Sequence, residues 1–294
     1  MTYMTAEAEG DGWKLMLGDS CERMAEIEDS SIDLSVYSPP FASLFTYSDS
    51  DRDLGNNASR EQFFEHYGFI IAENLRITKP GRICCVHVQQ LTTTKATNGV
   101  IGLTDFRGDV IRAYLEAGWI FHGEVTVNKD PQAQAIRTKA QALMFVTKNR
   151  DSSMTRPALA DYLLLFRAPG ENQTPIKNDV TNEEWIDWAQ PVWLDIRETN
   201  TLNTSVARDD ADERHICPLQ LDFIERCIRL WSNEGETVFS PFAGIGSEIY
   251  MASKLGRRGI GIELKPSYWQ TAVKNLESVD RAKDQMDLFA DIAG

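Results

Sequence analysis

Two turns that are far apart in the sequence most constrain the fold of this 294-residue chain. The first, residues 38–41 (Ser-Pro-Pro-Phe), follows the apolar run of residues 32–37. The apolar run is predicted to be a buried strand. Two consecutive prolines can neither continue a helix nor donate to a strand ladder, so the strand is expected to end in a rigid turn. The second turn, residues 241–247, is rich in glycine and lies between a strand-like run, residues 237–240, and a helix-like run, residues 248–255. It predicts a strand, tight turn and helix unit.

Elsewhere the chain alternates strand-like and helix-like runs, which is typical of a mostly parallel sheet with helices on both faces. Further strands are expected at residues 13–17, 82–88, 119–127, 143–147, 161–167 and 259–263, the fourth and fifth of these paired antiparallel at one edge of the sheet. Helices are expected at residues 20–27, 61–76, 106–117, 218–231 and 268–279, with Lys-Pro-Gly at residues 79–81 ending the second of them. The sequence therefore predicts a doubly wound, mostly parallel α/β fold.

Two stretches fit this alternation poorly. Residues 89–105 are polar and rich in threonine and glycine, and residues 171–213 contain Trp185, Trp188 and Trp193 among acidic and turn-forming residues. Loops of this length inside a compact domain are usually functional. The tryptophans are interpreted as local core, with a partner-binding surface as the alternative.

Composition and segment pattern narrow the class of protein. With 42% hydrophobic residues the chain can build the core of one large domain, and no apolar run approaches the roughly 20 residues of a membrane helix. The polar, acidic N-terminus lacks the features of a signal peptide, so a cytoplasmic protein without a membrane partner is expected. The five cysteines and four histidines lack the spacing of a disulfide framework or a metal site, and no metal is predicted.

The charge distribution bears on nucleic-acid binding. A net charge of -14 opposes nonspecific affinity for nucleic acid, because lysine and arginine supply most of such binding. Residues 129–156 nevertheless contain six basic residues against two acidic ones. This stretch is interpreted as a candidate nucleic-acid contact, with a solvated face as the alternative.

The glycine-rich turn has the features of a nucleoside site. Gly244 and Gly246 allow the backbone to approach a ligand at the start of a helix, where free N–H groups favour an anion. Glu263 ends the next expected strand, 17 residues beyond Gly246, close to where doubly wound nucleotide sites place an acid for the ribose hydroxyls. Because no third glycine follows at the dinucleotide spacing, a nucleoside with a small anionic group fits better than NAD.

The proline turn fixes two hydrogen-bond acceptors and an aromatic ring within four residues. The exocyclic amino group of a base is a poor nucleophile, because its lone pair is delocalised into the ring. The hydroxyl of Ser38 and the carbonyl of Pro39 can hold its two N–H bonds while Phe41 stacks on the base, so that the nitrogen pyramidalises toward a methyl donor. Methylation at C5 of cytosine would need a Pro-Cys pair, and the adjacent pair here, Cys217 and Pro218, has the opposite order. A merely stiff turn after a strand is the alternative.

With both motifs in this order, the chain resembles the amino-methylating DNA methyltransferases that use S-adenosylmethionine, in the arrangement in which the catalytic motif precedes the cofactor glycines. It is most similar to solitary, often phage-borne members. The resemblance extends over nearly the whole chain, on Gly18, Asp19, Ser20, Lys79, Pro80, Gly81, His215, Pro218, Gly261, Ile262, Glu263, Pro266 and Tyr268. It implies one methyltransferase domain over residues 1–294 with a seven-stranded type of sheet, in which residues 89–213 hold most of the inserted DNA-recognition elements.

The resemblance also implies site residues. The catalytic residues are Ser38, Pro39, Pro40 and Phe41. The residues that bind S-adenosylmethionine are Asp19, His215, Pro218, Phe242, Ala243, Gly244, Gly246, Ser247 and Glu263. Within this set Asp19 lies near the adenine, Glu263 takes the ribose hydroxyls, and the glycine turn lines the methionine end. The family usually has Asp where this chain has Ser240. For methyl transfer, the proline turn and the glycine turn have to lie at the ends of neighbouring strands.

The expected partner is double-stranded DNA, from which the target base is flipped out. Adenine N6 is the preferred target because solitary relatives mainly methylate adenine, and cytosine N4 is the alternative because it more often accompanies Ser-Pro-Pro-Phe. The expected DNA contacts are Lys95, Arg107, Lys129, Gln132, Gln134, Arg137, Lys139 and Gln141. A homodimer that shares the helices at residues 61–76 and 106–117 is also expected.

Two other functions compete with this interpretation. The acceptor nitrogen can belong to RNA or to a protein glutamine amide, whose planar nitrogen poses the same chemical problem. The second competing function is that of a non-catalytic protein that binds a nucleotide through the glycine turn. The excess of acidic residues and Ser240 in place of Asp favour it.

Overall fold

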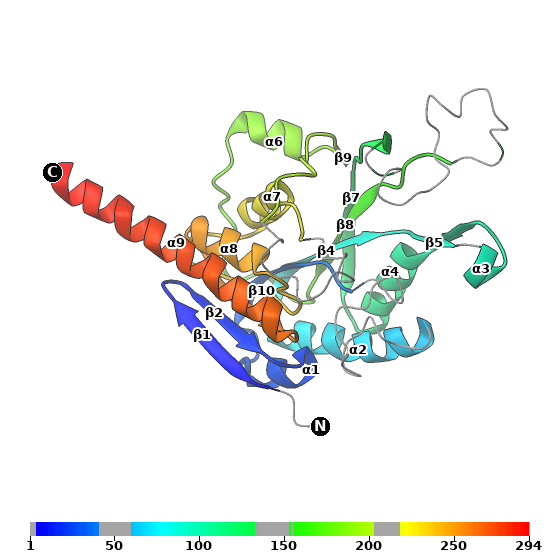
Figure 1. Cartoon of the computed structure of the whole chain (residues 1–294), viewed down its shortest axis with the longest axis horizontal. Coiled ribbons are helices and arrows are strands. Elements are labelled where there is room, and N and C mark those ends of the chain that lie inside the picture. Colours follow the sequence, from blue (N-terminus) through cyan, green and yellow to red (C-terminus); the bar gives the residue numbers. More distant parts are fainter. Residues whose placement is uncertain are drawn as a thin grey trace.

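A mixed β-sheet runs through the centre of the protein (Figure 1). The structure, a computed structural model, describes residues 4–40, 60–93, 95–132, 134, 153, 156–202 and 218–293. Within these ranges nine strands form the sheet, in the order β1-β2-β11-β10-β3-β4-β8-β7-β9. Their bounds are β1 Ala6–Gly10, β2 Trp13–Leu17, β3 Ile32–Tyr37, β4 Thr78–Gln89, β7 Ile120–Val127, β8 Asp161–Arg167, β9 Val192–Trp193, β10 Thr237–Ser240 and β11 Arg258–Glu263.

The centre of the sheet is parallel. Strands β2, β11, β10, β3 and β4 run in one direction, whereas β1 is antiparallel to β2, and β8 is antiparallel to both β4 and β7. β3 is buried along its whole length because helices cover both faces of the sheet, and its polar residues Asp33 and Ser35 are buried together with the apolar ones. The predicted doubly wound, mostly parallel α/β fold is confirmed, with the short edge strands β1 and β9 added to the seven-stranded arrangement.

Helices cover both faces of the sheet (Figure 1). Those of the described residues are α1 Ser20–Arg23, α2 Arg60–Ile77, α3 Lys95–Asn98, α4 Phe106–Glu116, α6 Asn182–Trp188, α7 Leu221–Trp231, α8 Ser247–Lys254 and α9 Pro266–Ala293. On one face α2 and α4 bury aromatic side chains such as Tyr67 and Tyr114. On the other face α7 and α8 bury Phe223 and Met251 against β3 and β10. α9 packs on α8, β1 and β2 and then extends beyond the sheet (Figure 1).

Some elements differ from the sequence-based expectation. β8 lies inside the sheet and not at an edge, because both of its sides are paired, with β4 and with β7. Residues 143–147, its expected partner, lie outside the described residues. β4 begins directly after α2, so residues 79–81 are part of the strand, and α9 is longer than expected. β1 escaped prediction because it is short and largely exposed.

The two irregular stretches contain short elements. Residues 89–105 include the hairpin of β5 (Leu91–Thr93) and β6 (Gly102–Thr104), which leads directly into α4. Residues 171–202 include α6 and β9. Of the tryptophans there, Trp193 is buried in the core, as predicted, whereas Trp185 is 50% exposed.

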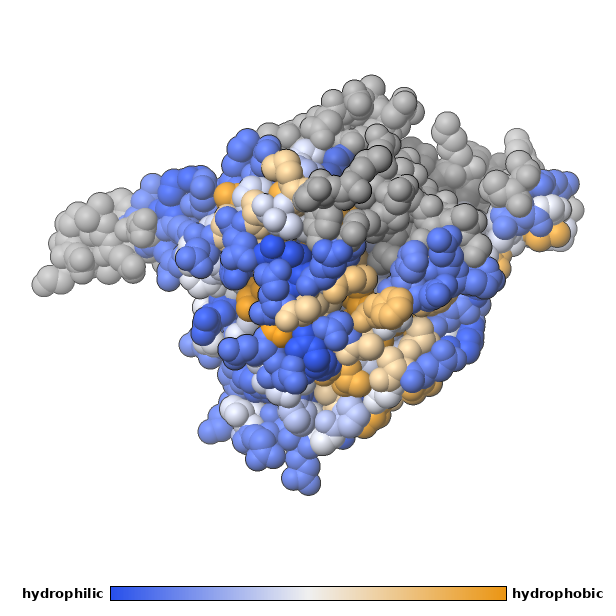
Figure 2. Space-filling view, turned by 90° about the horizontal axis from the view of Figure 1, so that it is seen from below, coloured by the Kyte–Doolittle hydropathy of each residue, from blue (hydrophilic) through white to orange (hydrophobic). Residues whose placement is uncertain are grey.

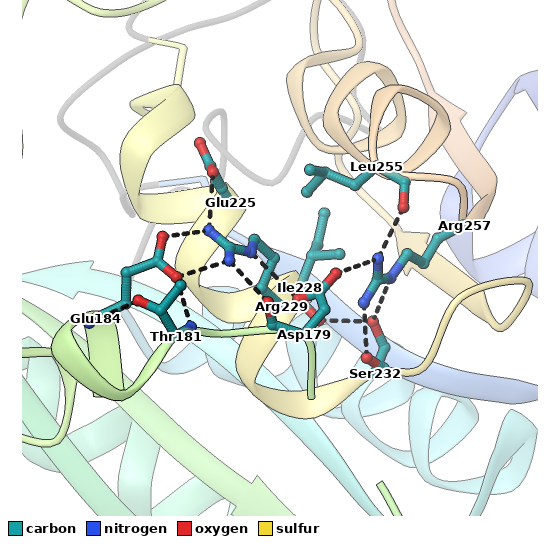
Figure 3. Close-up of polar contacts among 9 residues, drawn as sticks. All are labelled: Asp179, Thr181, Glu184, Glu225, Ile228, Arg229, Ser232, Leu255 and Arg257. Carbon is teal, nitrogen blue, oxygen red and sulfur yellow. Dashed lines mark hydrogen bonds and ion pairs between the residues drawn. The ribbon is translucent and has the colours of Figure 1, made fainter. Parts of the chain in front are cut away.

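A group of ion pairs fastens the α6 segment to α7 and to the turn after α8 (Figure 3). The guanidinium of Arg229 donates to both carboxylate oxygens of Glu184, over 2.7 and 2.8 Å, and to Asp179. Asp179 also accepts from Arg257, which is buried and bonds the backbone carbonyls of Ser232 and Leu255. The segment therefore returns to the sheet at β9 along a fixed path.

The Glu184 contact predicts a pH-dependent contribution to stability. The hydrogen bond to Arg229 and the helix cap at Thr181 lower the pKa of Glu184 to about 2. Because the folded pKa lies below the unfolded one, this contribution is present above the unfolded pKa and is lost as the pH falls toward 2. Glu184→Gln should lower the free energy of unfolding at pH 7 by up to about 1 kcal/mol, and by less at pH 3.5, in urea titrations.

The matched control is Glu183→Gln, which changes an exposed carboxylate one residue earlier in the same helical turn. It should unfold like the wild type at both pH values. Equal effects of the two substitutions would contradict a specific role of the Arg229 contact.

Candidate functional site

The two predicted turns lie side by side at one edge of the sheet. β10 pairs in parallel with β3, with Val238 opposite Leu34 and Phe239 opposite Ser35, so the turns that follow both strands leave the same edge. The chain continues from β10 to its neighbour β11 on one side and from β3 to β4 on the other. The strand order therefore changes direction between β3 and β10, and in open α/β sheets the crevice at such a point is where ligands bind.

Side-chain contacts hold the second turn against the first strand. The ring of Phe242 lies 5.7 Å from the ring of Tyr37, the last residue of β3, and 6.3 Å from that of Tyr67 in α2. The hydroxyl of Ser20 donates to the carbonyl of Pro241 over 2.5 Å, which ties the turn to α1. The second turn is therefore tied to β3, α2 and α1.

The glycine turn presents bare backbone to the crevice. Gly244 and Gly246 have φ angles of 54° and 87°, in the left-handed region that favours glycine. The N–H of Gly244 donates to Glu263 over 2.8 Å, and the other carboxylate oxygen accepts from the N–H of Lys265. A Cβ at Gly244 would meet no atom within 4 Å, so the space in front of this residue is open to a ligand.

Two buried hydroxyls flank this turn without a hydrogen-bond partner in the described part of the chain. They are the Oγ atoms of Ser240, which ends β10, and Ser247, which begins α8. Leaving a buried hydroxyl unpaired is unfavourable, and such atoms in folded proteins generally have an unseen partner. The turn therefore has the donor and acceptor groups of a binding site for a polar ligand.

Glu248 is an acidic residue of this region that the sequence did not single out. It is the second residue of α8 and is 5% exposed. Burial, together with the nearby charge of Glu263, raises the pKa of Glu248 to about 8. A cation that binds beside it would favour its ionised form.

The raised pKa of Glu248 predicts a loss of stability with rising pH. Between its unfolded pKa of 4.5 and its folded pKa of about 8, the unfolded chain releases a proton that the folded chain keeps, so the free energy of unfolding falls as the pH rises. Glu248→Gln removes this penalty. The variant should gain stability over the wild type between pH 5.5 and pH 8.5, by at most about 1.4 kcal/mol per pH unit, in urea titrations of the ligand-free protein.

Glu234→Gln, at an exposed position between α7 and β10, is the matched control and should show no such trend. A constant difference between Glu248→Gln and the wild type across this pH range would contradict the buried, protonated state.

Asp19 and Pro218 approach the same edge from two further elements. Asp19 follows β2, which pairs with β11, and the N–H of Gly18 donates to the carbonyl of Glu263. The Asp19 carboxylate accepts from the N–H of Cys21 over 2.9 Å and thereby caps α1. Pro218 precedes α7. Two other predicted site residues, Phe41 and His215, lie outside the described residues.

A buried polar network stands behind Ser38. The Ser38 hydroxyl donates to the carbonyl oxygen of His87 over 3.1 Å and lies 3.2 Å from the Nδ1 atom of the same residue. His87 Nε2 is 2.9 Å from Oδ2 of Asp161, and the same oxygen accepts from Lys129 over 2.7 Å. Gln89 donates to the other oxygen of Asp161 over 2.9 Å. A continuous path of polar contacts therefore runs from Ser38 to Lys129.

Strand pairing brings these groups together. Asp161 begins the antiparallel strand β8, opposite Gln89 at the end of β4 and Val127 at the end of β7. It therefore lies at the same edge as Ser38. Burial alone would raise the pKa of Asp161, but the adjoining His87 and Lys129 hold it below its ordinary value. The sequence signalled neither His87 nor Asp161, since their spacing matches no motif.

Comparison with known proteins identifies the family. The model of a DNA methylase family, that of the N6 and N4 methylases, matches residues 32–274. The chain belongs to this DNA methylase family. It is 23% identical over 285 residues to the type II methyltransferase M.MjaI of Methanocaldococcus jannaschii, covering 86% of this chain and 88% of the relative. It is 34% identical to M.BglI of Bacillus subtilis over 119 residues, 40% of this chain and 31% of that relative.

Solved structures share the fold of this DNA methylase. TTHA0409 of Thermus thermophilus, in complex with S-adenosyl-L-methionine, superposes with a TM-score of 0.67 at 21% identity, covering 90% of this chain and 92% of that one. The cytosine-N4-specific PvuII DNA methyltransferase superposes with a TM-score of 0.60 at 17% identity, covering 95% of this chain and 92% of that one.

Two side chains of the DNA methylase that are expected to contact DNA are instead buried inside the protein. The amine of Lys129 is buried against Asp161, and both amide atoms of Gln134 bond the backbone of Leu159. These two side chains are therefore corrected from DNA contacts to internal supports, because their polar atoms already have buried partners. The spacing of basic and amide residues in the sequence could not show which of them point inward.

The other expected DNA contacts of the methylase divide into three groups. Lys95 and Gln132 are exposed. Arg107 is half-buried, 3.4 Å from Glu124, and lies over the ring of Tyr162. Arg137, Lys139 and Gln141 lie outside the described residues. Within the part of the chain that the structure describes, no helix is long and apolar enough to span a membrane.

Proposed function

We propose that this DNA methylase is a site-specific DNA methyltransferase that methylates the exocyclic amino group of a base flipped out of duplex DNA. The observation that carries the proposal is the parallel pairing of β3 with β10, by which the proline turn and the glycine turn leave neighbouring strands at one edge of the sheet. Methyl transfer needs a donor site and an acceptor site within bonding distance of each other. The two turns provide one of each.

The glycine turn is the donor site. S-adenosylmethionine, the methyl donor, supplies an electrophilic methyl group on a sulfonium. Glu263 is placed to accept from the ribose hydroxyls, and the open backbone at Gly244 and Gly246 accommodates the methionine end. The hydroxyls of Ser240 and Ser247, which have no partner among the described residues, and the buried acid of Glu248 provide polar partners there, in the absence of an Asp at residue 240.

Asp19, His215, Pro218, Phe242 and Ala243 complete the proposed cofactor site. Asp19 follows β2, next to the strand that ends in Glu263, which suits contact with the adenosine end. Phe242 and Ala243 form the floor of the turn, since Phe242 packs on Tyr37 and Ala243 bonds the backbone of Ile262.

The proline turn is the acceptor site. The Ser38 oxygen and the Pro39 carbonyl accept the two N–H bonds of the amino group, Pro40 stiffens the turn, and Phe41 stacks on the base. The base has to leave the duplex to reach Ser38, which costs a few kcal/mol of unstacking. Contacts from residues 89–213, the proposed recognition region of this single domain, offset that cost. The exposed side chains of Lys95 and Gln132 belong to it.

Adenine N6 is the proposed target, supported by the resemblance of the whole chain to solitary adenine methylators. Cytosine N4 is the second candidate, favoured by a specific observation, which is Ser38 in place of an acidic or amide residue before the two prolines. A hydroxyl and a carboxylate can each accept an N–H, so product analysis has to decide between the two bases.

The acceptor role of Ser38 predicts a large loss of activity on its removal. Tritium transfer from labelled S-adenosylmethionine to unmethylated duplex DNA should fall by about 10²-fold or more in Ser38→Ala, since an acceptor aimed at the amino group in the transition state is lost. The label should be released by DNase and not by RNase or protease. Mass spectrometry of the digested DNA then identifies N6-methyladenine or N4-methylcytosine.

Ser278→Ala, an exposed hydroxyl change on α9, is the matched control and should keep full activity. Wild-type activity in Ser38→Ala would contradict the acceptor site. Label in RNA or in protein amides would instead favour the second class of acceptor.

We further propose that two copies of the methylase pair through the face formed by α2 and α4. Figure 2 shows apolar residues gathered on the side of the molecule that carries these helices. Phe69 is 61% exposed and Leu115 is 50% exposed, and a groove of about 520 Å³ runs between the two helices. The groove is bordered by charges of both signs, which suits the self-complementary contact of a two-fold dimer.

If the dimer forms through this face, a charge introduced there should separate the two copies. Light scattering should give the wild type twice the 33.2 kDa mass of one chain, and Phe69→Glu should give the mass of one chain. Trp185→Glu, a similar change at a 50% exposed residue of α6, should leave the mass of a dimer. A monomeric wild type, or a dimeric Phe69→Glu variant, would contradict the proposed face.

A further inference from the structure

The polar network behind Ser38 suggests how the amino nitrogen loses its proton. We propose that His87, oriented by Asp161, is a positioning residue that holds Ser38 as a hydrogen-bond acceptor and receives, through Ser38, the proton that the base releases. This inference rests on the proposed function, because it concerns the same methyl transfer. It adds a second layer of residues to the acceptor turn.

The first step of the argument concerns the hydroxyl hydrogen of Ser38. A serine hydroxyl has one hydrogen and two acceptor positions. To accept an N–H from a base, Ser38 has to donate its own hydrogen elsewhere. The two acceptors within reach among the described residues, the carbonyl oxygen at 3.1 Å and Nδ1 at 3.2 Å, both belong to His87. His87 therefore determines where the lone pairs of Ser38 point.

The second step concerns the tautomer of His87. An ionised carboxylate can only accept, so Asp161, 2.9 Å from Nε2, requires that this nitrogen carry the hydrogen. The Nδ1 atom that faces Ser38 is then a bare acceptor. His87 and Lys129 keep the pKa of Asp161 low, which maintains this arrangement despite burial. The order of the groups is that of a Ser-His-Asp triad with the two ring nitrogens exchanged, and Ser38 serves as a proton relay and not as a nucleophile.

The third step concerns the charges around the imidazole. Among the described residues, β8 contributes Asp161, the segment that follows β7 contributes Lys129, and α7 contributes the uncharged ring of Phe223, 5.2 Å from the imidazole. Lys129 already balances the charge of Asp161. A proton that reaches Nδ1 of His87 gives an imidazolium, which the adjoining carboxylate of Asp161 stabilises.

The proton and electron balance of the step is complete. The lone pair of the amino nitrogen forms a bond to the methyl carbon, the carbon–sulfur bond breaks, and its electron pair stays on sulfur. The nitrogen, now positively charged, gives one proton to Ser38 Oγ while the Ser38 hydroxyl proton moves to His87 Nδ1. The imidazolium returns this proton to water after the methylated base has left.

A role in the reaction explains the burial of this network better than a contribution to the stability of the fold. Asp161, His87 and Lys129 are each less than 10% exposed, and a buried ion pair contributes little net stability compared with an apolar replacement. Further along β8 on this face of the sheet, Leu163 and Leu165 belong to an apolar core cluster. The polar groups gather at the end of the strands, where Ser38 lies.

His87→Asn tests the proposal. The asparagine Oδ1 atom can accept the Ser38 hydrogen in place of Nδ1, but it cannot take the proton. The single-turnover methylation rate should fall by about 10–100-fold, and its decline at low pH should disappear. The dissociation constants for S-adenosylmethionine and for DNA should stay within about twofold of the wild type. His122→Asn, at an exposed histidine of β7, should leave the rate and its pH profile unchanged.

Two further measurements separate this role from a merely structural one. In the background of Ser38→Ala, His87→Asn should cause little additional loss, because His87 acts through Ser38. Nitrogen-15 NMR of the ligand-free protein should show His87 with its hydrogen on Nε2, and Asp161→Asn, which should also slow methylation, should change that tautomer. This second variant keeps the proposal falsifiable if His87→Asn does not fold.

The outcomes are distinguishable. A folded His87→Asn variant with the wild-type rate and pH profile would overturn the role of His87 and leave the proposed function intact. A His87 hydrogen on Nδ1 in the ligand-free wild type would overturn it as well. A wild-type protein that binds S-adenosylmethionine and methylates no DNA would overturn the proposed function together with this inference.

Discussion

Backbone hydrogen bonds between β3 and β10 join two strands that are separated by most of the length of the chain. Each strand is buried under helices on both faces, so the pairing is enclosed by the apolar side chains of Leu34, Val36 and Val238 on one side. The turns that leave the two strands are thereby held next to each other. Shifting β3 by one residue against its neighbours β10 and β4 would move Ser38 to the opposite face of the sheet and separate it from His87 of β4.

The polar groups of the molecule are distributed around this edge. Inside the sheet, the core is mainly apolar and aromatic, apart from small satisfied clusters such as Ser35, Asn74 and Cys84. At the carboxyl ends of the strands, by contrast, the protein buries two unpaired hydroxyls, the acid of Glu248, and the network of His87 and Asp161. A buried hydroxyl without a partner opposes folding, so the two hydroxyls indicate that a polar ligand binds at this edge, whereas His87 and Asp161 satisfy each other.

The fold also determines how much of the positive charge of the DNA methylase faces outward. A chain with a net charge of -14 needs locally concentrated cations to bind DNA. Lys129 is one of the basic residues in the basic stretch of residues 129–156, but its amine is bound to Asp161 inside the protein. Arg229 and Arg257 likewise neutralise carboxylates of the α6 segment (Figure 3). The sequence alone overstates how much of its positive charge faces a partner.

The sequence determined most of the long strands and helices and the two turns of this protein, because those depend on local rules, but not short elements such as β1, β5, β6 and α6. Residues 32–37 are mostly apolar, prolines cannot extend a strand, and glycines such as Gly244 adopt left-handed backbone at little cost. Only the tertiary structure decided which strands pair and which side chains face each other. β8 entered the sheet between β4 and β7, which brought Asp161 to His87, and no spacing along the chain encodes that contact. Long-range strand pairing depends on the summed burial of both faces of the sheet, so it can be known only once the whole core is assembled.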